Sequence, residues 1–302
     1  MTGDPITPGP VTGTAAGTAY LALPPTAVDA RPAGPTRLIV AWPGFDPPRT
    51  ASALAAAVPM TGVPTWRVYL DLPVERPGSL DGTTLLDNRG IEAFGTAVEQ
   101  AVERLPDVLA EIRRELDLPE GPVGMAGFSV GAAAALLAVV RGTVPVSTAA
   151  LIAPVIAPAR AARAMEARTG REHRWDDHAQ ALADRLDLGV RAGEIIERGT
   201  ALLLIAGAKD RVVPPTEVTA LRDLLERRGA RAVEAATFRM GHALAAEPGT
   251  EALPPITEAV RVDGVLTDWF RERLAEVDEP AQDRAAERPL NIEGITLGTP
   301  SC

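Results

Sequence analysis

The chain has 302 residues, of which 46% are apolar and 23% charged, a balance typical of a soluble globular protein that excludes a disordered chain. A formal net charge of -10 makes it a poor electrostatic partner for nucleic acid or for an anionic membrane. The single cysteine is Cys302, so neither an intramolecular disulfide nor a cysteine-based metal site is possible.

The first part of the chain combines an irregular start with alternating apolar and helical segments. Residues 1–35 are rich in Pro, Gly, Thr and Ala, so we expect an irregular arm with at most a short strand near residues 18–23. Pro106 lies inside a long segment of helical periodicity and should kink or split that helix. The elements expected after the arm are, in chain order, a strand at 37–42, a strand at 66–72, a helix at 91–118, a strand at 123–128 and a helix at 131–140.

Residues 121–140 carry no charge over 20 positions, which is the length of a membrane-spanning helix. The run starts with Gly-Pro and is interrupted by Gly124, Gly127 and Gly131, which favours a buried strand, a tight turn and a buried helix. The N-terminal residues have neither the basic start nor the continuous apolar core of a secretory signal. We therefore expect a cytoplasmic protein without a membrane partner.

The alternation continues through the second half of the chain. It predicts an α/β fold with a mostly parallel central sheet that is flanked by helices on both faces. No internal repeat is evident, so we expect one domain over residues 36–278, followed by a polar tail at 279–302. The elements expected here are a strand at 149–153, a charged helical segment at 159–199, a strand at 201–206, a helix at 217–228, a strand at 230–238 and a helix at 257–277.

The most specific motif is Gly127-Phe128-Ser129-Val130-Gly131, a G-x-S-x-G pattern in a chain with only five serines. It lies between a predicted strand and a predicted helix, which is the setting that a nucleophilic serine on a strained turn requires. A glycine two residues before and another two residues after the serine let the strand and the helix pass closely. The N-terminus of the helix then directs partial positive charge at the reaction centre.

With this motif in this setting, the sequence resembles the α/β-hydrolase superfamily from about residue 37 to about residue 277. The resemblance implies an acid after a later strand and a histidine after the next one. Asp210 follows the apolar run at 201–206, and its surroundings, Asp-x-x-Val-Pro, are similar to the acid loop of the family. His242 is one of three histidines and follows the next strand, at a position similar to the histidine loop of the family.

The resemblance implies a Ser-His-Asp triad with one role for each residue. Ser129 Oγ would attack a carbonyl carbon. His242 would take the proton of Ser129 and later protonate the leaving group. Asp210 would hold the imidazole in the correct tautomer and stabilise its charged form.

An oxyanion hole is also implied, made of two backbone N–H groups. One is that of Val130, directly after the nucleophile. The other is that of Phe45, which matches the position after the His-Gly pair of the family. The sequence departs from the family at Pro43, where many members carry the histidine of that pair.

The same residues have purely structural interpretations. Ser129 could occupy an ordinary tight turn, and Asp210 could cap a turn or pair with Arg211. His242 could be a buried structural histidine, and Phe45 only a core aromatic. We favour the catalytic interpretation because the motif, the acid and the histidine follow one another in the expected order.

Two further clusters lie between the strands predicted at 149–153 and 201–206. His173 and His178 lie among acidic residues, but five positions place them about 140° apart around a helix axis, so we expect no metal site. The resemblance implies a short helical lid at 158–199, and the loop 71–90 is the other candidate for shaping the pocket. Five arginines of the lid segment could bind an anionic group of a substrate. We prefer the interpretation that they lie on a solvated helix and are balanced by nearby acids. These arginines are Arg160, Arg163, Arg168, Arg171 and Arg174.

These observations predict a serine hydrolase that cleaves a carboxylic ester or thioester of a small-molecule substrate through an acyl-enzyme intermediate, without cofactor or metal. A peptidase or amidase on the same triad is one alternative. A non-catalytic binding protein that retains the fold is another. The oligomeric state and the acyl group of the substrate are left open.

Overall fold

The computed structural model describes residues 9–76 and 78–277, so the expected tail at 279–302 and Cys302 lie outside the described residues. The strands are β1 (Val11–Ala15), β2 (Thr18–Leu23), β3 (Ala30–Pro32), β4 (Leu38–Trp42), β5 (Trp66–Leu70), β6 (Val123–Phe128), β7 (Val146–Ile152), β8 (Ala201–Gly207), β9 (Val233–Phe238) and β10 (Ala275–Val277). The helices are α1 (Ala51–Ala57), the 3-10 helix η1 (Gly82–Leu86), α2 (Asn88–Glu115), α3 (Val130–Arg141), α4 (Pro158–Thr169), α5 (Asp177–Arg185), α6 (Ala192–Arg198), α7 (Pro215–Arg227) and α8 (Thr257–Leu274).

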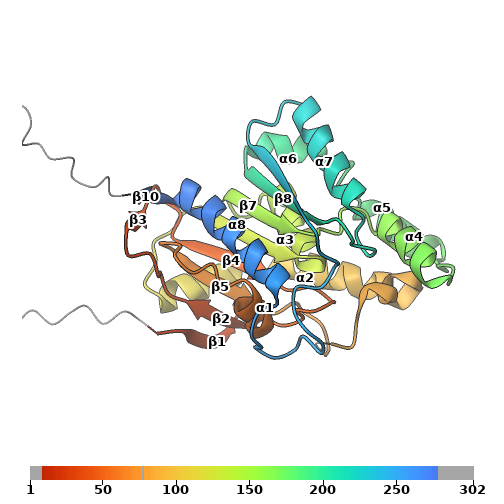
Figure 1. Ribbon diagram of the computed structural model, residues 1–302, viewed down its shortest axis with the longest axis horizontal. Helices are drawn as coiled ribbons and strands as arrows, with labels where there is room; N and C mark the ends of the chain where they lie inside the picture. The colour runs from red at the N-terminus through yellow and green to blue at the C-terminus, as the bar shows by residue number, and fades with distance from the viewer. Residues whose placement is uncertain (1–8, 77, 278–302) are drawn as a thin grey trace, which may run out of the picture.

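Eight of the strands form one sheet, in the order β1-β2-β5-β4-β6-β7-β8-β9 (Figure 1). All neighbours from β5 to β9 run parallel, and only β2 runs against its two neighbours. This confirms the mostly parallel central sheet. Its parallel arrangement brings the carboxyl ends of β4, β6, β8 and β9 to one edge, where ligands bind in open α/β sheets.

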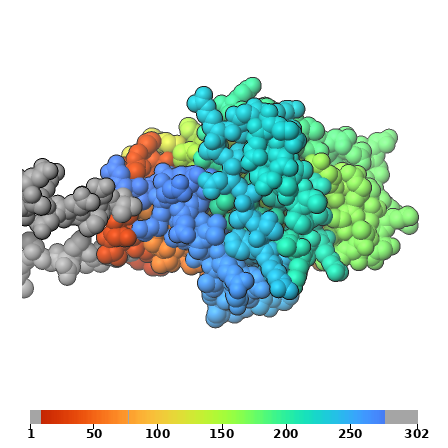
Figure 2. Space-filling view, turned by 45° about the horizontal axis from the view of Figure 1, so that its top comes forward, coloured from red at the N-terminus to blue at the C-terminus, as the bar shows by residue number. Residues whose placement is uncertain are grey.

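Helices cover both faces of the sheet, as the alternation predicts (Figure 1). On one face α1 packs on β2, β4 and β5 and contacts α8, which packs on β7. On the other face α3 packs on β4, β6 and β7 and contacts α2 and α6, while α7 packs on β8 and β9. Helices α4 and α5 lie at one end of the molecule, opposite to β3 and β10 (Figure 2).

The central strands and α3 are apolar because both sides of each are covered. Every residue of β4 and of β6 is buried, and α3 is buried from Val130 to Val140. The uncharged run at residues 121–140 is therefore a core strand, a turn and a core helix. Among the described residues, no helix has both the length and the apolar character needed to cross a bilayer.

The N-terminal segment departs from the expectation of an irregular arm. β1 and β2 form a hairpin that extends the sheet, because β2 pairs with β5 and buries Tyr20 and Ala22 against the core. The two turn residues, Ala16 and Gly17, have positive φ angles of 45° and 75°, as a tight hairpin turn needs.

One helical expectation needs correction. Pro106 does not split its helix, since α2 is continuous and the proline ring lies on its exposed side. The segment at 159–199 is helical, as predicted, and consists of three helices, α4, α5 and α6. Helix α4 ends at Gly170 in the left-handed conformation, and α5 starts anew where Asp176 accepts a hydrogen bond from Ala179 N–H at 2.9 Å.

Candidate active site

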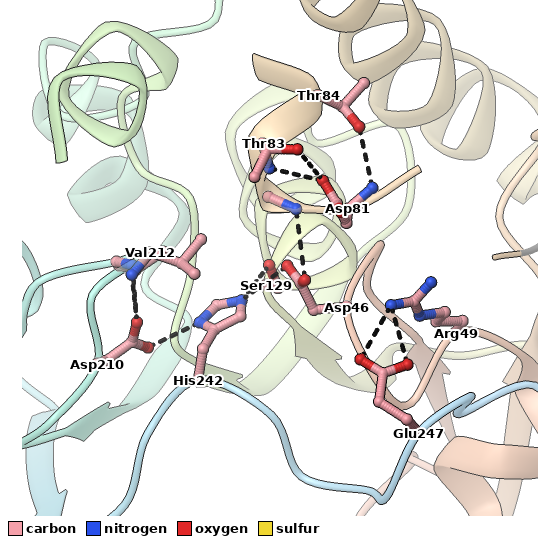
Figure 3. Close-up of polar contacts among 12 residues, drawn as sticks. Asp46, Arg49, Asp81, Thr83, Thr84, Ser129, Asp210, Val212, His242 and Glu247 are labelled. Atoms are coloured by element: carbon pink, nitrogen blue, oxygen red, sulfur yellow. Dashed lines mark hydrogen bonds and ion pairs between the residues drawn. The ribbon is translucent and has the colours of Figure 1, made fainter. Parts of the chain in front are cut away.

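Three of the residues singled out in the sequence meet at the carboxyl edge of the sheet (Figure 3). Ser129 follows β6, Asp210 follows β8 and His242 follows β9. His242 Nε2 lies 2.9 Å from Ser129 Oγ, and His242 Nδ1 lies 2.7 Å from Asp210 Oδ2. Ser129 and His242, which are 113 positions apart in the sequence, are thus linked with Asp210 in one series of hydrogen bonds.

The hydrogen-bond partners fix the imidazole tautomer. A carboxylate can only accept, so Nδ1–H donates to Asp210 and Nε2 is left to accept the hydrogen of Ser129 Oγ–H. Asp210 Oδ1 in turn accepts from Val212 N–H at 2.8 Å and from Val213 N–H at 2.9 Å. Its side chain is completely buried and oriented from both sides, and it cannot turn away from the imidazole.

Ser129 lies on a strained turn, with φ 55° and ψ −112°. A β-carbon on Gly127 would be 2.4 Å from Gly131 O, and one on Gly131 would be 2.3 Å from the carbonyl oxygens of Trp42 and Pro43. Ser129 N–H also donates to Ile152 O at 2.8 Å, which fixes the turn against the end of β7. The two glycines of the motif are therefore required by backbone packing, and the surrounding strands hold the strained residue in place.

The loops that carry the acid and the histidine are joined by their backbones. Ala208 N–H donates to Phe238 O at 2.7 Å, and Lys209 N–H donates to Met240 O at 2.9 Å. A β-carbon on Gly207 would lie 2.7 Å from Gly241 O, so only glycine allows this approach. The short distance between Asp210 and His242 follows from this pairing.

The loop after β4 packs directly against Ser129. A β-carbon on Gly44 would lie 3.0 Å from Ser129 Cβ and 2.8 Å from Phe128 Cδ1. Phe45 is 5% exposed, so its ring belongs to the core. Within the described part of the chain, the backbone N–H groups of Phe45 and Val130 donate to no protein acceptor. The two donors that the sequence singled out are thus both unpaired.

Asp46 is a polar residue of this centre that the sequence reading did not identify. Its Oδ2 lies 3.6 Å from His242 Nε2, the nitrogen that also faces Ser129. Its Oδ1 accepts from Gly82 N–H at 3.3 Å, at the start of η1 (Figure 3). Only its place directly after Phe45 could have indicated it.

The loop after β4, which carries Asp46, and the loop after His242 are joined by hydrogen bonds. Leu244 N–H donates to Pro47 O at 2.9 Å, and Arg49 N–H donates to Gly249 O at 2.7 Å. The Arg49 guanidinium also contacts the Glu247 carboxylate at 3.4 Å. The loop after β4 and the loop after His242 therefore form a single wall of the site.

Within the described residues, the predicted lid segment and the histidine pair form no hydrogen bond or ion pair with Ser129, Asp210 or His242. Helix α4 packs on η1, α5 packs on α2, and α6 belongs to the helical layer beside α3. Arg160, one of the five arginines, contacts Glu217 at 2.5 Å and Asp187 at 3.7 Å, as expected for arginines balanced by acids. His173 contacts Glu166 at 2.7 Å.

No family model and no curated protein matches this sequence. Solved structures do match. The crystal structure of TT1662 from Thermus thermophilus is 21% identical with a TM-score of 0.58, over 86% of this chain and 97% of that one. An acylaminoacyl peptidase from Pyrococcus horikoshii is 12% identical with a TM-score of 0.60, over 90% of this chain and 42% of the peptidase.

Further matches include a puromycin-hydrolyzing peptidase from Mycobacterium tuberculosis and Est1E from Butyrivibrio proteoclasticus. The first is 15% identical with a TM-score of 0.59, over 87% of this chain and 40% of that one. Est1E is 13% identical with a TM-score of 0.51, over 88% of this chain and 99% of that one. The chain spans about two fifths of each peptidase and nearly the whole of TT1662 and Est1E.

Proposed function

Because the chain has the α/β-hydrolase fold, we propose that it is a serine hydrolase that cleaves a carboxylic ester or thioester through an acyl-enzyme intermediate. The observation that carries this proposal is the hydrogen-bonded series Ser129–His242–Asp210 at the carboxyl edge of the sheet. A fold alone supports many functions, so the reaction class is inferred from this geometry.

The first half of the reaction forms the acyl-enzyme. Ser129 Oγ attacks the carbonyl carbon while His242 Nε2 accepts its proton, and Asp210 stabilises the imidazolium that results. The bond from the carbonyl carbon to the leaving oxygen or sulfur then breaks, and the leaving group takes the proton from Nε2. In the second half, water replaces Ser129 as the attacking group, and the same proton path releases the acid and regenerates the hydroxyl.

The negative charge that develops on the carbonyl oxygen requires donors that are already in place. The unpaired N–H groups of Val130 and Phe45 lie on the two segments that pack around Ser129, which supports their assignment as the oxyanion hole. Helix α3 begins at Val130, and the partial positive charge at its N-terminus would stabilise the negative oxygen. Pro43 supplies no side-chain donor, so the hole in this chain would depend on backbone groups.

Ester hydrolysis by matched variants tests the proposal. The wild-type enzyme should hydrolyse short acyl esters or thioesters, and Ser129→Ala and His242→Ala should each lower kcat on the order of 10⁴-fold or more. Ser147→Ala is the control, because Ser147 lies at the opposite end of the sheet, where its hydroxyl donates to Val123 O. Equal rates in wild type and Ser129→Ala would overturn the proposal and favour the binding-protein alternative.

A peptidase or amidase remains the second candidate, since two of the four similar structures described above are peptidases. An ester and an anilide of the same acyl group separate the two reactions. A kcat/KM for the anilide close to that for the ester would favour the peptidase. Turnover of the ester alone would favour the esterase.

A further inference from the structure

The carboxylate of Asp46 is a charged group at the reaction centre that the triad mechanism does not use. Its Oδ2 and the attacking Ser129 Oγ lie 3.6 Å and 2.9 Å from the same atom, His242 Nε2. Asp210 already occupies the other imidazole nitrogen and already stabilises the imidazolium. A second carboxylate beside Nε2 therefore faces the space in which substrate must bind.

Asp46 is held in this position by packing as well as by hydrogen bonding. Gly82 N–H donates to its Oδ1, and a β-carbon on Gly82 would lie 3.2 Å from Oδ2 and 2.9 Å from Val212 Cγ1. The carboxylate thus lies between η1 and the imidazole, with Gly82 N–H on Oδ1 and His242 Nε2 near Oδ2. These contacts keep the charge directed at the centre.

Within the described residues, no arginine or lysine forms an ion pair with this carboxylate. Across residues 9–76 and 78–277, the only ion-pair partner of Asp46 is His242, and the nearest arginine in sequence, Arg49, pairs with Glu247 instead. A partly buried carboxylate is stabilised by a nearby cation. A substrate that brings its own ammonium group would supply that cation.

The Asp46 carboxylate can be reached from solvent. Its side chain is 19% exposed, whereas that of His242 is 6% exposed and that of Asp210 is 0% exposed. Ser129 as a residue is 2% exposed. Among these polar groups, Asp46 is the one most open to solvent, so a substrate can bring a charged group to its carboxylate.

We propose that Asp46 selects substrates that carry an ammonium group a few bonds from the scissile carbonyl, with α-amino acyl esters as the class that fits best. This inference rests on the proposed serine hydrolase function. In such an ester the ammonium nitrogen is two bonds, about 2.5 Å, from the carbonyl carbon. When that carbon lies at Ser129 Oγ, the ammonium nitrogen is within reach of the Asp46 carboxylate, because Asp46 Oδ2 and Ser129 Oγ both lie beside His242 Nε2. The products are the free amino acid and the alcohol, and anionic acyl groups are repelled.

A matched pair of substrates, compared in wild type and in the Asp46 variant, measures the effect of the ammonium group on recognition. The benzyl ester of alanine and the benzyl ester of isobutyric acid differ only in an ammonium group replaced by a methyl group. Both are assayed at one pH of about 6.5, below the pKa of an α-amino group, so that the ionisation of the enzyme cancels in the ratio of their kcat/KM values. We expect the wild-type enzyme to favour the alanine ester about 10- to 100-fold.

The variant Asp46→Asn tests whether this carboxylate is the cause. Asparagine keeps an oxygen for Gly82 N–H, removes the charge and replaces the other oxygen by an NH2 group of similar size. We expect the ratio to fall about 10-fold or more through loss on the alanine ester, with kcat/KM for the isobutyrate ester largely retained. Glu251→Gln is the matched control, because it removes an exposed carboxylate from the loop after His242 and should leave the ratio unchanged.

Each outcome is decisive. Equal loss on both esters in Asp46→Asn would show that Asp46 acts through His242 and would overturn the inference. So would a wild-type enzyme that hydrolyses the isobutyrate ester at least as well as the alanine ester, a result that needs no variant. Either result leaves the serine hydrolase proposal intact, because the neutral ester is still turned over at Ser129. Absence of turnover of any ester, together with no covalent labelling of Ser129, would instead overturn both.

Discussion

Gly131→Ala places one methyl group where the structure has no room for it. The new β-carbon would lie 2.3 Å from the carbonyl oxygens of both Trp42 and Pro43, and these are backbone atoms that cannot rotate away. To restore ordinary contact, α3 and the end of β4 must separate by about 1 Å. We expect a loss of about 1–3 kcal/mol in the free energy of unfolding, despite the higher helix propensity of alanine.

The same displacement moves the loop that carries Phe45 N–H away from Ser129. A misplacement of about 1 Å at a reaction centre can lower the rate on the order of 10²-fold. Urea unfolding followed by circular dichroism measures the first effect, and ester kcat/KM measures the second.

Gly264→Ala is the control for Gly131→Ala, because Gly264 lies inside α8 and a β-carbon there would meet no atom within 4 Å. It should raise stability by about 0.5–1 kcal/mol and leave kcat/KM unchanged. If Gly131→Ala were as stable and as active as Gly264→Ala, the packing account of the motif would be refuted.

Two other changes test the acid of the triad and a buried carboxyl. Asp210→Asn keeps an acceptor for Val212 and Val213 N–H but no longer fixes the tautomer of His242, so kcat for an ester should fall on the order of 10⁴-fold; a loss below tenfold would contradict the role of Asp210. Burial raises the pKa of the Asp71 carboxyl, against the opposing effect of the hydrogen bond from Ala51 N–H. Its ionised form therefore costs stability, so Asp71→Asn should be more stable than wild type at neutral pH, by under about 1 kcal/mol. That gain should disappear as the pH falls through the raised folded pKa, because the wild-type carboxyl is then protonated; urea midpoints that keep the same difference down to pH of about 3 would contradict this.

The three residues of the proposed triad could be brought together from the sequence because each depends on local signals. Gly127 and Gly131 are fixed by backbone contacts that no other residue allows, so the motif around Ser129 is visible in the residues themselves. Asp210 and His242 follow strands that pair with their neighbours in chain order, so their convergence follows from the alternation of strands and helices.

The hairpin β1–β2 and the position of Asp46 could not be obtained in the same way. The hairpin is built largely from Thr, Gly and Ala, whose small side chains give a weak alternation, and its place in the sheet depends on the distant strand β5. Asp46 faces the centre because of contacts with Gly82 and His242, 36 and 196 positions away in the sequence. No local pattern distinguishes it from other aspartates in loops.

Covalent labelling with a fluorophosphonate probe tests the central claim most directly. The probe reacts with a serine whose hydroxyl is activated by a neighbouring base, and the labelled peptide identifies that serine. The account predicts labelling at Ser129 in the wild-type protein, none in Ser129→Ala, and a large loss of the labelling rate in His242→Ala. A folded wild-type protein that remains unlabelled, or that is labelled equally fast in His242→Ala, would contradict an activated nucleophile at Ser129.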